Sequence, residues 1–107
     1  MHDSFVVAAQ VAKSLASELV SRRLVACVNT VLGVESTYWW GGKVQTDQEL
    51  LLIMKTTSAT MPRLITAVQE LHPYDVPEVI ALPVVAGSDP YLQWVRTNVH
   101  HSPPVAP

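Results

Sequence analysis

The chain has 107 residues, of which 49% are hydrophobic and 15% are charged, and its formal net charge is -2. This length suits one domain with one core. The high apolar share favours burial of some surface against further copies of the chain. The longest basic run is Arg22-Arg23, which argues against a nucleic-acid-binding protein. The single cysteine excludes an intrachain disulfide and a zinc site of several cysteines. No apolar run approaches the roughly 20 residues of a membrane helix, so we expect no membrane span.

The chain is expected to begin with a short strand and a helix. Residues 4–9 could form the strand, and from about Gln10 the apolar spacing becomes that of a helix. The buried stripe of this helix is predicted to contain Val11, Ala12, Leu15, Ala16, Leu19 and Val20. Arg22 and Arg23 would lie in its last turn, where positive charge suits the helix dipole.

A long β-hairpin follows, with Gly41-Gly42 as its turn signal. Its first arm is predicted over residues 24–40, with a bulge or bend at Gly33, and its second arm over residues 43–55. Arms of this length reach roughly 45 to 55 Å at about 3.3 Å per residue, so the hairpin must bend or overhang the domain. An overhanging arm invites pairing with another chain. We therefore expect a homo-oligomer whose interface includes the three aromatic residues of the tip, Tyr38, Trp39 and Trp40.

The second half of the chain predicts a helix, a strand and a further helix. The helix should begin near residues 58–60, because Pro62 is tolerated only close to a helix start, and it should stop at Pro73. The apolar run at residues 78–84 predicts a central strand under the helices. Asp89-Pro90 is typical of the start of a helix. The complete order predicts an α+β fold of the ferredoxin-like, split βαβ type with an added C-terminal helix. Both main helices would cover one face of the sheet, and further copies of the chain would cover the other.

The loop before the last strand is stiffened by two prolines and carries polar side chains suited to binding. His72 is the strongest candidate metal ligand, because histidine titrates near neutral pH and is the commonest side-chain ligand. A histidine that contacts the last carbonyls of a helix is an equally good interpretation. Asp75 and Glu78 could join a metal site, or they could cap the turn and pair with Lys55 or Lys43.

Two further candidates lie on the hairpin. Cys27 could be a soft ligand for copper, although a small buried cysteine is the commoner case. Lys55 could point into a cleft, although a lysine at a strand end is more often solvated. The tip aromatics could stack on a ligand, but the hairpin carries few basic residues, which favours interface packing. No nucleophile–base set, phosphate loop or closed metal motif can be read, so any site would be open, weak or shared between subunits.

Five segments, in a fixed order, give the chain a resemblance to a known family. They are Ala26-Cys27-Val28-Asn29, Tyr38 to Val44, Met54-Lys55-Thr56, His72 to Pro83, and Tyr91 to Trp94. In this order they are similar to the CutA family of divalent-cation tolerance proteins. The resemblance covers about residues 11–99, and the segment from His72 to Pro83 is its most specific part.

The resemblance implies a trimer of ferredoxin-like domains, similar to the PII signalling proteins, in which the long hairpins pair between subunits. It implies no enzymatic activity, and a role in tolerance of copper or another divalent cation. Cys27 and His72 match the family's cysteine and loop histidine, and they would be the metal ligands. Asp75 and Glu78 would be further oxygen donors, and Tyr74 would line the inter-subunit cleft with them. No metal is expected to be required for folding.

Two alternatives to a metal-binding function remain. A PII-like sensor would bind a small molecule in the cleft near Lys55, Tyr74 and Glu78. A structural trimer would present its surface to a protein partner, and animal members of the family have been linked to anchoring acetylcholinesterase.

The first twelve residues depart from the family pattern, because members usually open with a longer strand. A shortened first strand, or one absorbed into the helix, is therefore expected. Residues 1–99 would form the single domain, and residues 100–107 a disordered tail. No targeting signal is visible, which suits a cytoplasmic protein or one in an organelle lumen after loss of a targeting peptide.

Overall fold

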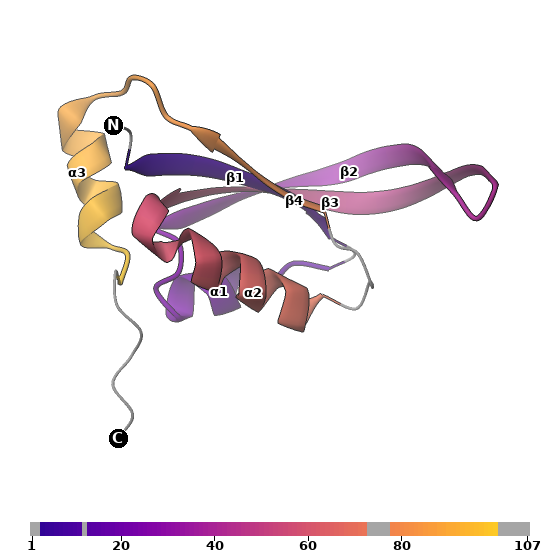
Figure 1. Cartoon of the computed structure of the whole chain (residues 1–107), viewed down its shortest axis with the longest axis horizontal. Coiled ribbons are helices and arrows are strands. Elements are labelled where there is room, and N and C mark those ends of the chain that lie inside the picture. The colour runs from indigo at the N-terminus through magenta and orange to yellow at the C-terminus, as the bar shows by residue number, and fades with distance from the viewer. Residues whose placement is uncertain (1–2, 12, 73–77, 101–107) are drawn as a thin grey trace.

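The computed structural model describes residues 3–11, 13–72 and 78–100 of the chain. The element order is the predicted one: β1 (Ser4–Val11), α1 (Ala16–Ser21), β2 (Cys27–Trp40), β3 (Lys43–Thr57), a 3₁₀ turn (Ser58–Thr60), α2 (Met61–Leu71), β4 (Glu78–Pro83) and α3 (Asp89–Thr97). The strands form one antiparallel sheet in the order β2-β3-β1-β4. Helices α1 and α2 lie on one face of this sheet, and α3 stands at one end (Figure 1).

Strand β1 corrects the prediction for the start of the chain. The strand runs to Val11, and α1 begins only at Ala16, so the helix predicted from Gln10 is wrong over its first residues. β1 is also central rather than shortened, because it pairs with β3 along its whole length and with β4 over six residues. Ala12 of the predicted stripe lies outside the described residues.

The physical reason is that one set of apolar residues fits two periodicities. Val11, Leu15 and Leu19 are four residues apart, which suits a helix, whereas Val7, Ala9 and Val11 alternate, which suits a strand. All five are buried. Val11 belongs to both patterns, and ladder hydrogen bonds place it in the strand. Helix α1 also ends at Ser21, so Arg22 and Arg23 follow it instead of lying in its last turn, and Arg23 takes a positive φ of 59°.

The main core lies between the sheet and the helices α1 and α2. It is built from alternate residues of the two central strands, which face each other as Val7 with Met54 and Ala9 with Leu52. All four are at most 1% exposed. Helix α2 closes the core with Leu64, Ala67 and Val68. As expected, Pro62 stands in the first turn of this helix.

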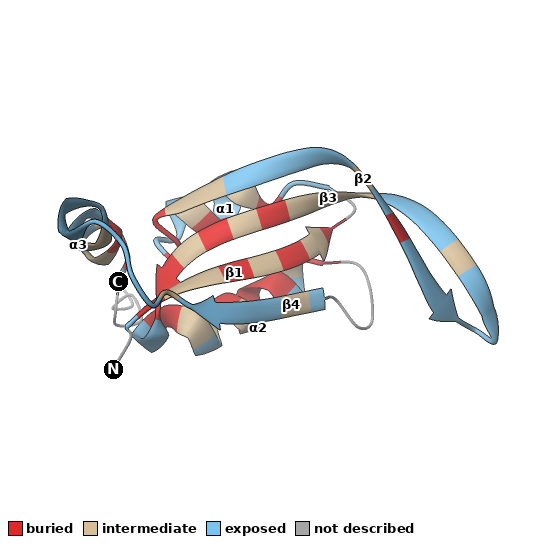
Figure 2. Cartoon of the chain, turned by 90° about the horizontal axis from the view of Figure 1, so that it is seen from above, coloured by how far each residue is buried: buried red, intermediate tan, exposed pale blue. Residues whose placement is uncertain are grey.

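The hairpin is long, bent and projecting, as predicted (Figure 2). Strands β2 and β3 have 14 and 15 residues, and the tight turn is formed by Gly41 and Gly42, both at positive φ. The register shifts between Val31 and Val34, so the bulge predicted at Gly33, which has φ +71°, is confirmed. The β1–β3 ladder stops at Leu50, so residues 43–49 of β3 are paired with β2 alone within the described chain.

Strand β4 differs from the central strand predicted at residues 78–84. It lies at the edge of the sheet, pairs with β1 alone within the described chain, and has no buried residue. Ile80 and Leu82 are 52% and 58% exposed. An apolar run indicates that its side chains become buried. It does not indicate whether helices of the same chain or another molecule cover them.

Helix α3 packs at the end of the sheet through Val95, which forms a second small core with Ala26 and with Val99 from the segment after the helix. Its N-cap is Ser88, whose Oγ accepts a hydrogen bond from the Tyr91 N–H at 3.4 Å, so the cap falls one residue before the predicted Asp89. The described residues contain no helix long and apolar enough to cross a membrane.

Replacing Thr56 with valine is expected to lower the free energy of unfolding by about 1–3 kcal/mol. Thr56 is fully buried, and its Oγ1 donates to the carbonyl oxygen of Leu24 at 2.7 Å. Valine keeps the shape but leaves that carbonyl without this donor. The check is urea unfolding at a fixed protomer concentration. The control is Thr46→Val, which removes an exposed hydroxyl contact at 3.2 Å to Thr37 and should change stability by less than about 0.5 kcal/mol. Equal effects for the two variants would contradict the prediction.

Candidate functional site

The candidate site residues Cys27, Lys55 and Glu78 all lie on the sheet face opposite the helices α1 and α2. Paired residues of neighbouring strands point to the same side of a sheet, so the register defines three rows of side chains that run from β2 to β4. The rows are Cys27, Lys55, Val6 and Leu82; then Asn29, Ile53, Ala8 and Ile80; then Val31, Leu51, Gln10 and Glu78. We call these twelve side chains the open face.

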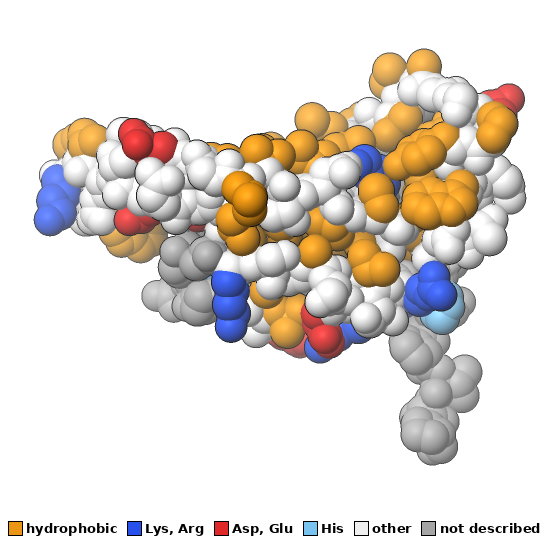
Figure 3. Space-filling view, turned by 180° about the vertical axis from the view of Figure 1, so that it is seen from behind, with side chains coloured by type: hydrophobic (Ala, Val, Ile, Leu, Met, Phe, Trp, Pro, Cys, Tyr) orange, Lys and Arg blue, Asp and Glu red, His pale blue; other side chains and the backbone are white. Residues whose placement is uncertain are grey.

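The open face is apolar at its centre. Its middle row has only one polar member, Asn29, and Ile80 of this row is 52% exposed. Leu82 and Val31, in the outer rows, are 58% and 41% exposed. Seen from behind, hydrophobic side chains gather around the end of the molecule that carries α3 and along its upper rim (Figure 3). A surface of this kind marks an interaction site.

Cys27 lies at the α3 end of the open face. Its Sγ is 3.8 Å from the hydroxyl oxygen of Tyr91, and its side chain is half-buried. Partial burial raises the pKa of Tyr91 above its ordinary value, and the neighbouring Cys27 thiol adds to the shift. The phenol is therefore neutral at physiological pH. The ring of Tyr91 stacks on Trp94, with centroids 5.7 Å apart.

Lys55 stands beside Cys27, and its Nζ donates a hydrogen bond to the Oδ1 of Asn29. The bulge produces this neighbourhood. Counting back from the Trp40–Lys43 pair at the turn without a shift would place Thr56 opposite Cys27, and the bulge moves the register by one residue so that Lys55 faces it. Because one residue of slip exchanges the two faces of a strand, the bulge brings a cation and a thiol to the same side.

Glu78 lies at the other end of the sheet from Cys27. Glu78 is exposed and pairs with Gln10, whereas Cys27 is in the row of Leu82. Along the strands, Cys27 and Glu78 are four residues apart, which is roughly 13 Å. Across the sheet they are three strand spacings apart, which is roughly 14 Å. His72 ends α2, is 6% exposed, and its backbone N–H donates to the Val68 carbonyl at 2.9 Å.

A single chain does not complete the predicted metal site from its described residues. No cluster of three or more His, Cys, Asp or Glu side chains that could hold a metal occurs among them. Tyr74 and Asp75 lie outside the described residues. The donor types suit copper, since thiolate and imidazole are ligands that it favours, but Cys27 and Glu78 are too far apart to share an ion in one chain. Their joint role stays a prediction that requires a second copy.

Sequence reasoning missed Tyr91 as a neighbour of the candidate residues. Alternation in the sequence does place Asn29 on the side of Cys27, as the register shows. The contact between Cys27 and Tyr91 joins residues 64 positions apart, and no local pattern signals it.

The tip of the hairpin is the second candidate surface. Trp39 and Trp40 are 70% and 56% exposed, and the facing Val44 is 63% exposed. The hydroxyl of Tyr38 donates to the Asp47 carboxylate across the hairpin. Consecutive residues point to opposite sides of a strand, so one flat contact cannot cover both tryptophans.

Comparison with known proteins gives consistent matches. Residues 5–98 match the family described as CutA1 divalent ion tolerance protein. The chain is 52% identical over 89 residues to the Divalent-cation tolerance protein CutA of Thermus thermophilus, covering 83% of this chain and 86% of that protein. It is 51% identical over 90 residues to Protein CutA 1, chloroplastic, of Oryza sativa, covering 84% of this chain. The chain spans 51% of the length of this rice relative.

The fold is also that of solved structures. The crystal structure of CutA1 from Oryza sativa superposes with a TM-score of 0.88 at 45% identity, covering 94% of this chain and 97% of that chain.

Proposed function

Because the chain belongs to the CutA1 divalent ion tolerance family, we propose that it acts in metal-ion tolerance as a homotrimer that binds copper or another divalent cation. The proposal is of a binding protein without a catalytic reaction. The observation that carries it is the open face, which combines an exposed apolar centre with the thiol of Cys27 at one end and the carboxylate of Glu78 at the other.

The trimer is supported by the surface that one chain leaves uncovered. The strand order β2-β3-β1-β4, with α1 and α2 on one face, fits the ferredoxin-like split βαβ arrangement. Such a two-layer domain buries only one side of its sheet. The exposed Ile80 and Leu82 of the edge strand and the projecting hairpin give a second copy both an apolar face and open strand edges.

Assembly also offers a route to a complete metal site. Cys27 supplies a half-buried thiol on the open face, and a thiolate is a soft ligand that suits copper. The remaining ligands would come from another subunit, with His72, Asp75 and Glu78 as the proposed donors. A bound ion would hold adjacent subunits together and would remove free copper from solution. Lys55 is the register partner of Cys27, so the proposed thiolate ligand has a positively charged side chain beside it.

Replacing Cys27 with serine is expected to weaken copper binding at least tenfold without changing the mass of the assembly. Serine keeps the size of the side chain but replaces a soft sulfur ligand by a hard oxygen. Copper titration by calorimetry measures the affinity, and light scattering measures the mass, which should be about 35 kDa for three chains of 11.7 kDa. Tyr91→Phe is the matched control, because it removes the hydroxyl beside the sulfur and leaves the proposed ligand.

The loop histidine is tested in the same way. His72→Ala should also lose copper binding, whereas His100→Ala, which removes an exposed histidine, should keep it. Circular dichroism establishes that the His72 variant is folded. A trimer that binds copper equally well with and without Cys27 and His72 would exclude this site and leave the fold and assembly unaffected.

Two other functions are supported by separate observations. The Lys55–Asn29 pair on the open face could recognise an anionic small molecule in a cleft that Tyr74 and Glu78 complete, as in a PII-like sensor. A shift of the melting temperature with such a metabolite, and none with copper, would favour it. The exposed tryptophans of the tip could instead hold a protein partner. A location in the cytoplasm or in an organelle lumen stays a prediction.

A further inference from the structure

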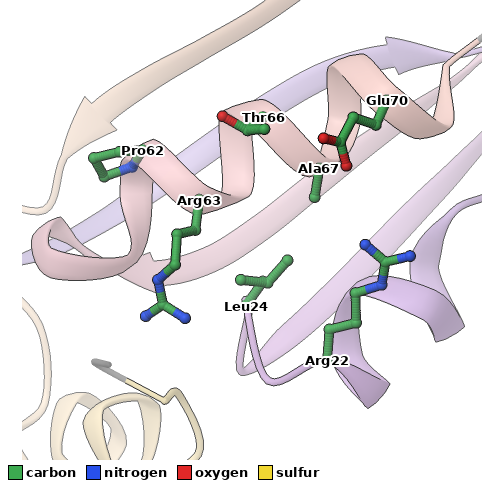
Figure 4. Close-up of a pocket in the computed structure, with 7 residues that line it drawn as sticks. All are labelled: Arg22, Leu24, Pro62, Arg63, Thr66, Ala67 and Glu70. Atoms are coloured by element: carbon green, nitrogen blue, oxygen red, sulfur yellow. The ribbon is translucent and has the colours of Figure 1, made fainter. Parts of the chain in front are cut away.

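A groove lies on the helical side of the molecule, away from the open face. It has a volume of about 470 Å³ and separates α2 from the turn between α1 and β2 (Figure 4). Arg63 projects from α2 and Arg22 from the opposite wall, with the buried Leu24 and Ala67 between them. Pro62, Thr66 and Glu70 complete the lining. The α2 residues recur at helical spacing, so the groove follows one side of this helix.

The last described residue, His100, is held at one end of this groove by hydrogen bonds. The backbone N–H of His100 donates to the carbonyl oxygen of Arg23 at 3.0 Å. The His100 carbonyl accepts hydrogen bonds from the Arg63 guanidinium and, at 3.4 Å, from the hydroxyl of Thr60. Val99 before it is buried with Ala26 and Val95. A groove-lining side chain therefore already binds the last described residue, at the Arg63 end of the groove.

The segment that follows His100 is long enough to occupy the groove. From Arg63 to Glu70 the helix advances seven residues, or about 10 Å at 1.5 Å per residue. Residues 101–107 (His-Ser-Pro-Pro-Val-Ala-Pro) would span about 22 Å in a polyproline II conformation at 3.1 Å per residue. Residues 101–107 could thus span about twice the distance from Arg63 to Glu70 along the groove.

The composition of this segment matches the lining. Three of its seven residues are prolines, so it has seven backbone carbonyls but only four backbone N–H groups. Arg22 and Arg63 supply hydrogen-bond donors for surplus carbonyls, and each guanidinium has five N–H groups. Pro103, Pro104 and Val105 can cover the buried floor at Leu24 and Ala67. Prolines also reduce the conformational entropy that docking removes.

We propose that residues 101–107 of this chain dock into its own groove between α2 and the α1–β2 turn. This departs from the disordered tail expected from composition. The docked segment covers an apolar surface on the side of the protein that the proposed metal site and trimer do not use. Any other proline-containing segment has to displace it before it can bind there.

The test compares the full chain with a chain that ends at His100, by NMR of isotopically labelled protein. We expect the amides of Thr66 and Glu70 to shift when the tail is removed. In the full chain, the amides of Val105 and Ala106 should have order parameters above about 0.6, the upper limit of a flexible backbone. Added to the truncated chain, a synthetic peptide of residues 101–107 should return Thr66 and Glu70 towards their full-chain positions.

Two substitutions on α2 separate docking from a general effect on stability. Thr66→Trp fills the groove from an exposed lining position, and it should release the tail so that the order parameters fall below about 0.6. Gln69→Trp places the same side chain at an exposed position that does not line the groove, and it should leave the tail docked. Pro103→Gly together with Pro104→Gly should lower the affinity of the peptide for the truncated chain several-fold.

Three results would overturn the proposal. The first is a full chain with low order parameters at Val105 and Ala106 and unchanged Thr66 and Glu70 amides after truncation. The second is release of the tail by both tryptophan substitutions alike. The third is docking that increases with protein concentration, which would assign the groove to the tail of a second assembly.

Discussion

Replacing Ile80 with aspartate is expected to dissociate the proposed trimer into monomers of 11.7 kDa at micromolar concentration. Ile80 lies in the middle row of the open face, where a single chain leaves it 52% exposed. Covering such a side chain contributes about 1.5–3 kcal/mol, and a buried, unpaired carboxylate costs several kcal/mol more. The substitution is present in every subunit, so its free-energy cost applies at each contact between subunits. Light scattering coupled to size-exclusion chromatography measures the mass.

The matched control for Ile80→Asp is Ala59→Asp. Ala59 is an exposed apolar residue in the 3₁₀ turn before α2, on the helical side of the molecule. The Ala59→Asp substitution introduces the same charge away from the open face. The assembly should therefore keep its mass of about 35 kDa, three times the 11.7 kDa of one chain. If the Ile80 variant also keeps this mass, the open face does not form the contact between subunits.

Removing both tip tryptophans, as Trp39→Ser with Trp40→Ser, is expected to raise the dissociation constant of the assembly at least 100-fold. Tryptophans at the centre of an interface typically contribute 2 kcal/mol or more each, and about 1.4 kcal/mol is a factor of ten. Because the two side chains point to opposite sides of the hairpin, a neighbouring subunit has to surround the tip. The measurement is the mass distribution over a dilution series.

Substitution of both tryptophans by phenylalanine is the control for the tip. Phenylalanine keeps an aromatic ring on each side of the hairpin, so most of the affinity should remain. Circular dichroism should show the same strand content in both double variants, since the tip pairs only with itself within the described chain. A serine variant that assembles normally would instead assign the tip to a partner of different sequence.

The hairpin was the most predictable part of the fold because its signals are local. Gly41-Gly42 determines the turn, and Gly33 marks the bulge two residues after Val31. The start of the chain was less predictable, because Val11 satisfies both a strand and a helix pattern. Its strand conformation depends on partners about 40 to 70 residues away, Leu50 for Val11 and Glu78 for Gln10.

The candidate site was predictable in its residue types but not in its arrangement. Alternation places Cys27 on the side of Asn29, whereas the neighbour Lys55 depends on a one-residue shift at the bulge. The edge position of β4 could not be read from its apolar composition, because the same composition suits a strand covered by its own helices and one covered by another copy. Only the pairing of β4 with β1 distinguishes the two.

The central position of β1 has a consequence for how the protein is made. Its partners run from Leu50 to Thr57 and from Glu78 to Pro83, so β1 is synthesised before either of the strands with which it pairs. The β2–β3 hairpin, whose contacts are local, can form early, and β1 can then pair with β3, while its other edge stays open until β4 has been made. Such non-local pairing is slow, because the entropy cost of closing the long loop comes before the contacts that stabilise it. The four-stranded sheet can therefore be completed only after residue 83 has been synthesised.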